Sequence, residues 1–225
     1  GVDVSVLLDQ ASDCRELMKT NPEVVIDVAY LLLTQAEQFL GFTDSGSNFP
    51  GLSDWIEQLI AESTGKEEQG RLPIATEGFR EAAMGGAFSV SFAPGAELTV
   101  EAELGEHFLF WEWVTALLGA ALVIDPFNQP NVTEAKEATS AVLAEWSTSL
   151  PVITTANSED SVEIFGDGNT LVAALKNLIA NTDADGYIAI TAYLDRIGDS
   201  KLSELRAILS EKSGRPVSFG WGPRF

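Results

Sequence analysis

The chain has 225 residues, of which 45% are apolar, so it is long enough and apolar enough to form a substantial hydrophobic core. Its 34 acidic residues outnumber its 13 Lys and Arg residues, and the resulting net charge of −21 disfavours nucleic acid or an anionic membrane surface as a partner. Cys14 is the only cysteine, which excludes a disulfide framework and favours a reducing compartment such as the cytoplasm.

The N-terminal part of the chain is predicted to be helical. Apolar residues recur at helical spacing over Val4–Met18 and Glu23–Leu40, with an Asn-Pro pair between the two segments. After a turn-rich loop, DWIEQLIAES predicts another helix that ends at Gly65. We therefore expect residues 1–40 to form a helical segment that precedes the core of the fold.

The middle of the chain combines short strands with an apolar helix. RLPIATE and AFSVSF predict strands, and ELTVEAEL predicts a further one. GEHFLFWEWVTALLGAALVI is apolar on nearly every side at helical spacing, which predicts a buried helix in a layered domain. Its apolar stretch Trp113–Ile124 is shorter than the roughly 20 residues of a membrane span, and we expect no signal peptide in GVDVSVLLDQ.

The last third of the chain repeats this alternation. The pattern predicts helices over Thr133–Trp146, Asn169–Ala180 and Lys201–Lys212, and strands at LPVITT, SVEIFG, GYIAITAYL and PVSFGW. Strands that alternate with helices of this length predict a mainly parallel sheet with helices on both faces. We therefore expect one α/β domain over residues 1–225, with its core over 41–140 and further strand-helix units over 141–225.

Several familiar motifs are incomplete in this sequence. STGK lacks the first glycine and the final hydroxyl residue of a phosphate-binding P-loop, and NTDADGYIAITA has Ala192 where a calcium loop needs Glu. His107 is the only histidine, which excludes any site with two imidazoles. Its neighbours Phe108 and Phe110 favour a helix-end histidine packed against aromatic rings, and a base for a nucleophile is the alternative. We expect neither a metal nor another cofactor.

Two stretches favour a ligand site. AESTGKEEQGRLPIATEG places Lys66, Arg71 and Glu77 in loop or strand-end positions, where side chains of different elements can converge on a ligand. IDPFNQPNVTEAK places Lys136 early in a helix that follows a turn flanked by prolines. Taken alone, either stretch is also consistent with an ordinary loop.

Together with the closing FGWGPRF, these stretches resemble the C-terminal sugar-isomerase (SIS) domain of glucose-6-phosphate isomerase, in the bacterial form that also occurs fused to transaldolase. The family carries Glu-Ser-x-Gly-Lys at the first stretch and Phe-Asp-Gln-x-x-Val, followed by Lys, at the second. Phe127–Lys136 reproduces this spacing with Gln129 and Val132 in register, and Asn128 stands in place of the usual Asp.

The resemblance implies a three-layer αβα sandwich with a mainly parallel sheet, preceded by a helix pair, and aldose-ketose isomerisation of glucose 6-phosphate and fructose 6-phosphate. It implies that Lys136 stabilises negative charge from the start of a helix, and that Glu77 is the base that moves a proton between neighbouring carbons. It also implies that Ser63, Lys66 and Gln129 bind the substrate. The pathways would be glycolysis and gluconeogenesis in the cytoplasm.

The resemblance covers essentially this whole chain but only the second half of the family's enzyme. We therefore expect an incomplete enzyme fragment, which acts as a homodimer or pairs with a first SIS domain. The family's ring-opening histidine has no counterpart here. The alternatives are a non-catalytic domain that binds a sugar phosphate or assembles with a partner, and a purely structural α/β domain.

Overall fold

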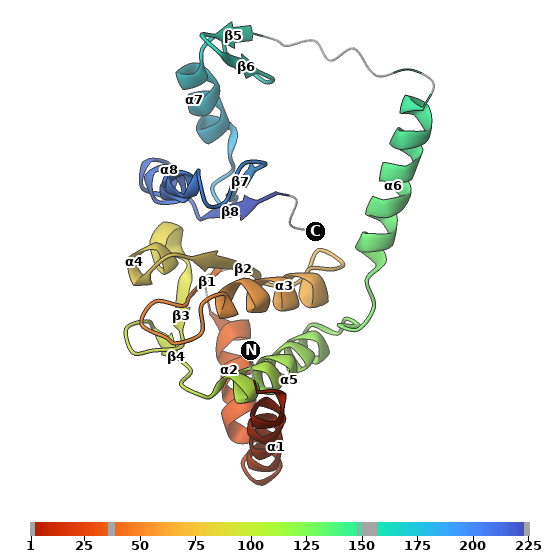
Figure 1. Cartoon of the computed structure of the whole chain (residues 1–225), viewed down its shortest axis with the longest axis vertical. Coiled ribbons are helices and arrows are strands. Elements are labelled where there is room, and N and C mark those ends of the chain that lie inside the picture. Colours follow the sequence, from red (N-terminus) through yellow and green to blue (C-terminus); the bar gives the residue numbers. More distant parts are fainter. Residues whose placement is uncertain (1–2, 36–38, 148, 150–156, 223–225) are drawn as a thin grey trace. The chain divides into compact units, whose positions relative to one another are not determined.

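The computed structural model describes residues 3–35, 39–147, 149 and 157–222 (Figure 1). Contacts divide the chain into two compact units: Gly1–Gln129 together with Ile190–Phe225, and Pro130–Ala189. The sequence pattern does not indicate this division, and the single domain expected over residues 1–225 stays a prediction.

The first unit contains most of the helices and strands. In chain order these are α1 (Val4–Thr20), α2 (Glu23–Thr34), β1 (Phe39–Thr43), α3 (Leu52–Thr64), β2 (Leu72–Thr76), α4 (Phe79–Ala82), η1 (Met84–Gly86), β3 (Phe88–Ser91), β4 (Leu98–Thr99), α5 (Leu104–Leu122), η2 (Ser200–Glu204), α8 (Leu205–Ser213) and β8 (Val217–Trp221). β7 (Ile188–Ala192) pairs with β8 in a separate two-stranded sheet.

The main sheet has four strands in the order β2-β1-β3-β4, and each neighbouring pair is parallel. Gly41 in the centre of β1 lies opposite Ile74 on β2 and Ser89 on β3. Parallel strands need crossover connections, and helices supply them between β1 and β2 and between β2 and β3. The predicted α/β class with a mainly parallel sheet is therefore confirmed.

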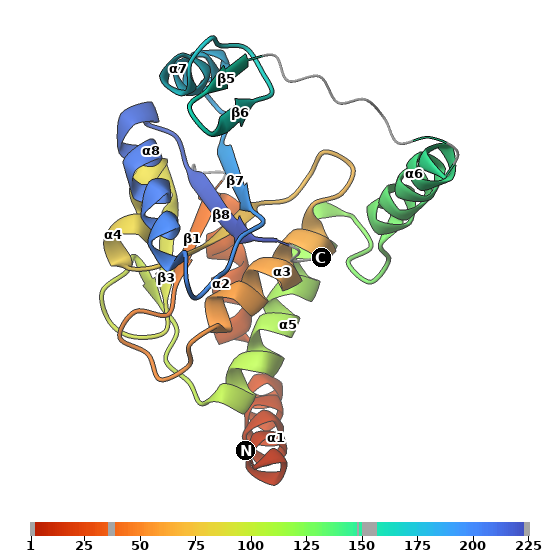
Figure 2. The ribbon, with the colours of Figure 1, turned by 45° about the horizontal axis from the view of Figure 1, so that its top comes forward.

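Helices cover both faces of this sheet. Leu40 and Phe42 on β1 are fully buried in a core that they share with side chains of α2, α3 and α5. Gly41 points to the opposite face, where a Cβ atom would lie 1.9 Å from the carbonyl oxygen of Ala82 on α4. Figure 2 shows α4 on one side of β1 and α3 and α5 on the other. A side chain at position 41 would therefore force α4 away from the sheet.

The apolar helix α5 forms the centre of the core. A capping box starts it, in which Glu103 accepts from the backbone of the third helical residue and Glu106 accepts from the N–H of Glu103. Trp111 is fully buried and meets Phe42 edge to face, with ring centroids 5.5 Å apart. The predicted buried helix is confirmed.

The second unit contains α6 (Pro130–Trp146), β5 (Asn157–Glu159), β6 (Val162–Ile164) and α7 (Leu171–Asn181). Pro130 opens α6, a position at which proline loses no helical hydrogen bond. Thr170 caps α7 by accepting from the N–H of Ala173 at 3.2 Å. β5 and β6 form an antiparallel hairpin, with Asp160 at a positive φ of 52° in its turn.

Three sequence predictions differ from the structure. The helix predicted over Glu23–Leu40 ends at Thr34, and Phe39 and Leu40 belong to β1. The strands of the last third were expected to extend one parallel sheet, but β5 and β6 pair only with each other and β7 pairs with β8. ELTVEAEL forms only the two-residue strand β4. LPVITT lies outside the described residues, among which no helix is long and apolar enough to cross a membrane.

Candidate functional site

The residues expected to form the site fall in three places. Ser63 and Lys66 lie at the end of α3 and in the loop that leads into β2, where Gln129 also makes contact. Glu77 follows β2 at its other end, and Lys136 belongs to the second unit. The ends of a five-residue strand are roughly 13 Å apart. Glu77 therefore does not share a site with Ser63 and Lys66.

Glu62, in the last turn of α3, lies at the centre of the first group. The Nε2 atom of Gln58, one turn earlier, donates to its Oε1 at 3.0 Å, and the Nε2 atom of Gln129 donates to its Oε2 at 3.2 Å. Each oxygen of this carboxylate thus accepts an amide N–H. Within the described residues both of these donors are neutral amides, and together they orient the carboxylate.

Lys66 joins the two motif-bearing stretches. Its side chain is buried, and Nζ donates to the carbonyl oxygen of Asp125 at 2.8 Å and to both the carbonyl oxygen and the Oδ1 atom of Asn128, the latter at 3.2 Å. We expected Lys66 to bind the substrate directly. In the structure its N–H groups instead donate hydrogen bonds to a turn of the same chain, about sixty residues away in sequence.

The turn that Lys66 contacts is fixed to the end of α5. Val123 ends α5 in the left-handed conformation, with a φ of 60°, and the N–H of Ile124 donates to the carbonyl oxygen of Gly119 at 3.0 Å. Pro126 packs on Gly119, where a Cβ atom would lie 2.7 Å from its Cγ. The N–H of Phe127 donates to Oδ1 of Asp125 at 2.9 Å. This turn therefore holds Gln129 at a defined place beside α3.

Ser63 and Lys136 complete the predicted set. Ser63 is half-buried in the last turn of α3, directly after Glu62. Lys136 lies in the second turn of α6 with an exposed side chain, and its carbonyl oxygen accepts from the hydroxyl of Ser140 at 2.8 Å. In sequence, α6 begins directly after Gln129.

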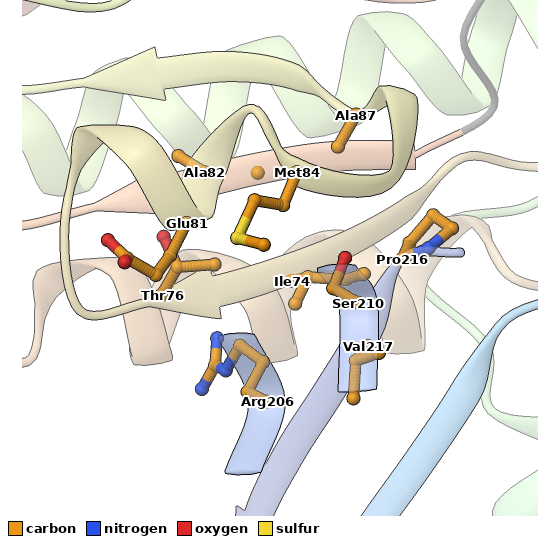
Figure 3. A pocket seen from close by; sticks show the side chains of 11 residues that line it. Ile74, Thr76, Glu81, Ala82, Met84, Ala87, Arg206, Ser210, Pro216 and Val217 are labelled. Carbon is orange, nitrogen blue, oxygen red and sulfur yellow. The ribbon is translucent and has the colours of Figure 1, made fainter. Parts of the chain in front are cut away.

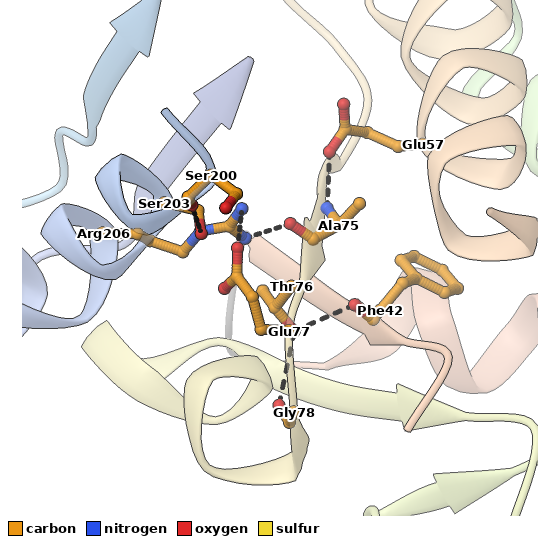
Figure 4. Close-up of polar contacts among 9 residues, drawn as sticks. All are labelled: Phe42, Glu57, Ala75, Thr76, Glu77, Gly78, Ser200, Ser203 and Arg206. Carbon is orange, nitrogen blue, oxygen red and sulfur yellow. Dashed lines mark hydrogen bonds and ion pairs between the residues drawn. The ribbon is translucent and has the colours of Figure 1, made fainter. Parts of the chain in front are cut away.

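Glu77, at the carboxyl end of β2, is bound to an arginine. The Nη2 atom of Arg206 on α8 lies 3.1 Å from Oε1 of Glu77, and Nη1 donates to the carbonyl oxygen of Ala75 (Figure 4). The carboxylate of Glu57 on α3 accepts from the N–H of Ala75. Arg206 is 5% exposed, so its positive charge is almost wholly inside the protein.

The electrostatics of this pair combine burial and attraction. Burial raises the pKa of the Glu77 carboxyl, and the positive charge of Arg206 lowers it by a smaller amount. Burial likewise lowers the pKa of Arg206, with Glu77 opposing that shift. The guanidinium holds the Glu77 carboxylate in an ion pair and offsets part of the rise in pKa that burial causes.

Two cavities adjoin Arg206. One of about 290 Å³ lies at the carboxyl end of β2 and has a mixed polar and aromatic lining that includes Asp54, Glu77, Arg196, Arg206 and Trp221. The other has a volume of only about 10 Å³ and lies among Ile74, Met84, Val217 and Arg206 (Figure 3). The first can hold a small polar molecule, whereas the second has room for about one water molecule.

Glu62 is the residue that sequence reasoning missed. It is the Glu of the Glu-Ser-x-Gly-Lys motif itself, so the signal was present in the stretch that carried the resemblance. No group of His, Cys, Asp or Glu side chains in the described parts of the chain could hold a metal ion.

Comparison with known proteins adds no relative. No protein-family model matches the chain, and neither does any curated protein sequence. The fold defines the class, an α/β protein with a parallel four-stranded sheet. A particular function rests on the residues of the site.

Proposed function

We propose that this chain is a sugar-phosphate isomerase domain of the SIS type, which interconverts glucose 6-phosphate and fructose 6-phosphate. The observation that carries the proposal is the Glu62 carboxylate held between the amides of Gln58 and Gln129. This contact brings together the two stretches in which the sequence resembles the family. A parallel sheet with helices on both faces agrees with the three-layer sandwich of an SIS domain.

The chemistry needs a base and a site of positive charge. Glu62 accepts the proton from carbon 2 of the open-chain aldose and returns it to carbon 1, while the hydroxyl proton moves between the two oxygens. Gln58 and Gln129 hold the carboxylate in place during both transfers, because each amide bonds a different oxygen. Lys136 supplies positive charge to the enediolate that forms between the two steps.

Lys136 also matters for binding. The substrate is a dianion, and the chain carries a net charge of −21, so association needs a local positive group. Early in α6, Lys136 adds its charge to the positive partial charge of the helix start. The cytoplasm, and either a homodimer or a pairing with a first SIS domain, belong to the same proposal.

Glu77 remains the alternative base. The pKa of its carboxyl is raised by burial, which suits a base, but its ion pair with Arg206 opposes that use. We therefore favour Glu62, and substitution of each carboxylate tests the choice.

A second candidate function is binding without conversion. The cavity of about 290 Å³ beside Arg196 and Arg206 favours it, because two guanidinium groups, three carboxylates and several hydroxyls line a space large enough for a monosaccharide-sized ligand. A protein of this kind would bind fructose 6-phosphate but leave its carbon-bound hydrogens in place.

Solvent exchange in deuterium oxide separates these functions. Isomerisation through an enediol exchanges a carbon-bound hydrogen with the solvent, so NMR of fructose 6-phosphate incubated with the chain detects even slow turnover. The proposal predicts that any deuterium incorporation and formation of glucose 6-phosphate is reduced about 10²-fold or more by Glu62→Gln and by Lys136→Ala. Glu77→Gln is the matched control for loss of one carboxylate.

Each other outcome has a definite meaning. Exchange that survives Glu62→Gln but not Glu77→Gln would move the base to Glu77. Saturable binding of fructose 6-phosphate without exchange would establish the binding function instead. A folded chain that neither binds the sugar phosphate nor exchanges its hydrogens would contradict both.

A further inference from the structure

We propose that Lys66 is a positioning residue, which holds Gln129 against Glu62 by fixing the turn between α5 and α6. Its catalytic meaning rests on the proposed function, whereas the positioning itself does not. The sequence resemblance alone assigned Lys66 to the substrate. The ammonium group of Lys66 instead donates hydrogen bonds to oxygen atoms of Asp125 and Asn128 in the same chain.

The hydrogen bonds of Lys66 fit this role in number and direction. An ammonium group has three N–H donors, and the structure provides three acceptors: the carbonyl oxygens of Asp125 and Asn128, and the Oδ1 atom of Asn128. With its side chain only 5% exposed, Lys66 has little room to turn toward another partner.

The contact with Asn128 controls the next residue directly. The carbonyl group of Asn128 and the N–H of Gln129 belong to one planar peptide unit, so a fixed carbonyl fixes the start of Gln129. The side chain of Gln129 then reaches Glu62 at 3.2 Å. A chain of contacts thus runs from Lys66 through Asn128 and Gln129 to the carboxylate.

The electrostatic setting of Lys66 gives a further reason. Within the described residues, no carboxylate lies within 4.0 Å of its Nζ atom, so carbonyl and amide oxygens alone balance the buried charge. Burial of a charge without an ionic partner is unfavourable unless its hydrogen bonds are well made. The charge therefore favours the one turn conformation that supplies these oxygens.

The first test needs no substrate. In Lys66→Met the donors are lost while most of the side-chain volume remains, and the exposed Lys19→Met on α1 is the matched control for the same change. We expect the side-chain amide protons of Gln129 to have NMR signals away from solvent-like positions in the wild type and in Lys19→Met. In Lys66→Met these signals should move to solvent-like positions.

A second variant covers the case in which Lys66→Met does not fold. Asn128→Ala removes only the Oδ1 acceptor and keeps both backbone acceptors. It should shift the Gln129 amide signals in the same direction by a smaller amount. Unchanged Gln129 signals in either folded variant would overturn the proposal.

A double-mutant cycle on turnover tests the link to catalysis. If Lys66 acts through Gln129, then Lys66→Met should lower kcat in the wild type but have less than a twofold effect in a Gln129→Leu background. If Lys66 contacts the substrate or acts only through general stability, the two losses should multiply. A wild-type chain without turnover would bear on the proposed function alone, because the NMR test still decides the positioning.

Discussion

The imidazole ring of His107 meets the ring of Phe92 edge to face, with ring centroids 5.1 Å apart. Phe49 meets it in the same way at 5.6 Å. The side chain is fully buried, and among the described residues neither ring nitrogen has a hydrogen-bond partner. The predicted packing against aromatic rings is therefore confirmed, and these two rings belong to residues outside α5.

Replacement of His107 by Phe should stabilise the fold. Phe keeps an aromatic ring against Phe49 and Phe92 and removes two buried polar atoms, each of which costs free energy when it is unpaired. We expect an increase of about 1 kcal/mol in the unfolding free energy at neutral pH, measured by urea denaturation. His107→Asn, which keeps a polar group but loses the ring, should be less stable than the wild type. A Phe variant with a lower unfolding free energy than the wild type would show that the imidazole has hydrogen-bond partners or that the larger ring overfills the site.

Stability should also depend on pH through His107. Burial lowers its pKa from 6.5 to about 4. Between these pH values the unfolded chain binds a proton that the folded chain does not, so stability falls as the pH decreases through this range. The difference in unfolding free energy between His107→Phe and the wild type should therefore widen by about 3 kcal/mol from pH 7 to pH 4. A difference in unfolding free energy that stays constant from pH 7 to pH 4 would contradict the lowered pKa of His107.

Val123→Gly should stabilise the chain. Val123 ends α5 with a φ of 60°, and its side chain is 87% exposed, so it gains little from packing while its branched Cβ atom strains the left-handed conformation. Glycine adopts this conformation without strain and is the common residue at helix C-termini. We expect thermal unfolding to show a gain of about 1 kcal/mol. Val142→Gly, inside α6, is the control and should be destabilising or neutral.

Glu77 and Arg206 should be coupled in stability. Glu77→Gln leaves the buried guanidinium without its anion, so we expect a loss of about 1 kcal/mol, kept small because the Glu77 side chain is 45% exposed. The loss should shrink in an Arg206→Met background, where the buried guanidinium is absent. Urea denaturation of the four proteins of the cycle measures this coupling. Equal losses in both backgrounds would mean that the pair contributes nothing as a pair.

The α/β class followed from the alternation of helices and strands, but the first strand did not. Phe39 and Leu40 continue the helical spacing of apolar residues from α2, and β1 is buried on both faces, so its apolar residues show no alternation. A short apolar run of this kind is compatible with either a helix or a buried strand. β5 was missed for the opposite reason, since Asn157–Glu159 contains no apolar residue.

The motifs of the site could be predicted from the sequence, but the contacts between them could not. The two motif-bearing stretches were identified from the sequence, and the structure brings them together through Lys66 and Gln129. The role of Lys66 depends on hydrogen bonds to residues about sixty positions away, which local spacing does not reveal. Glu77 was favoured because it follows a strand, whereas its partner Arg206 is 129 residues distant in sequence.

Ala75 has a consequence for the behaviour of this protein in a crowded solution. It lies on β2, the strand at one end of the four-stranded sheet. Its N–H group donates to Glu57, and its carbonyl group accepts from Arg206. A strand from another molecule would need both groups to extend the sheet, and it would first have to displace two charged side chains. Proteins in which the N–H and carbonyl groups of an edge strand are unpaired are prone to associate edge to edge. Glu57 and Arg206 together protect this strand from that kind of self-association.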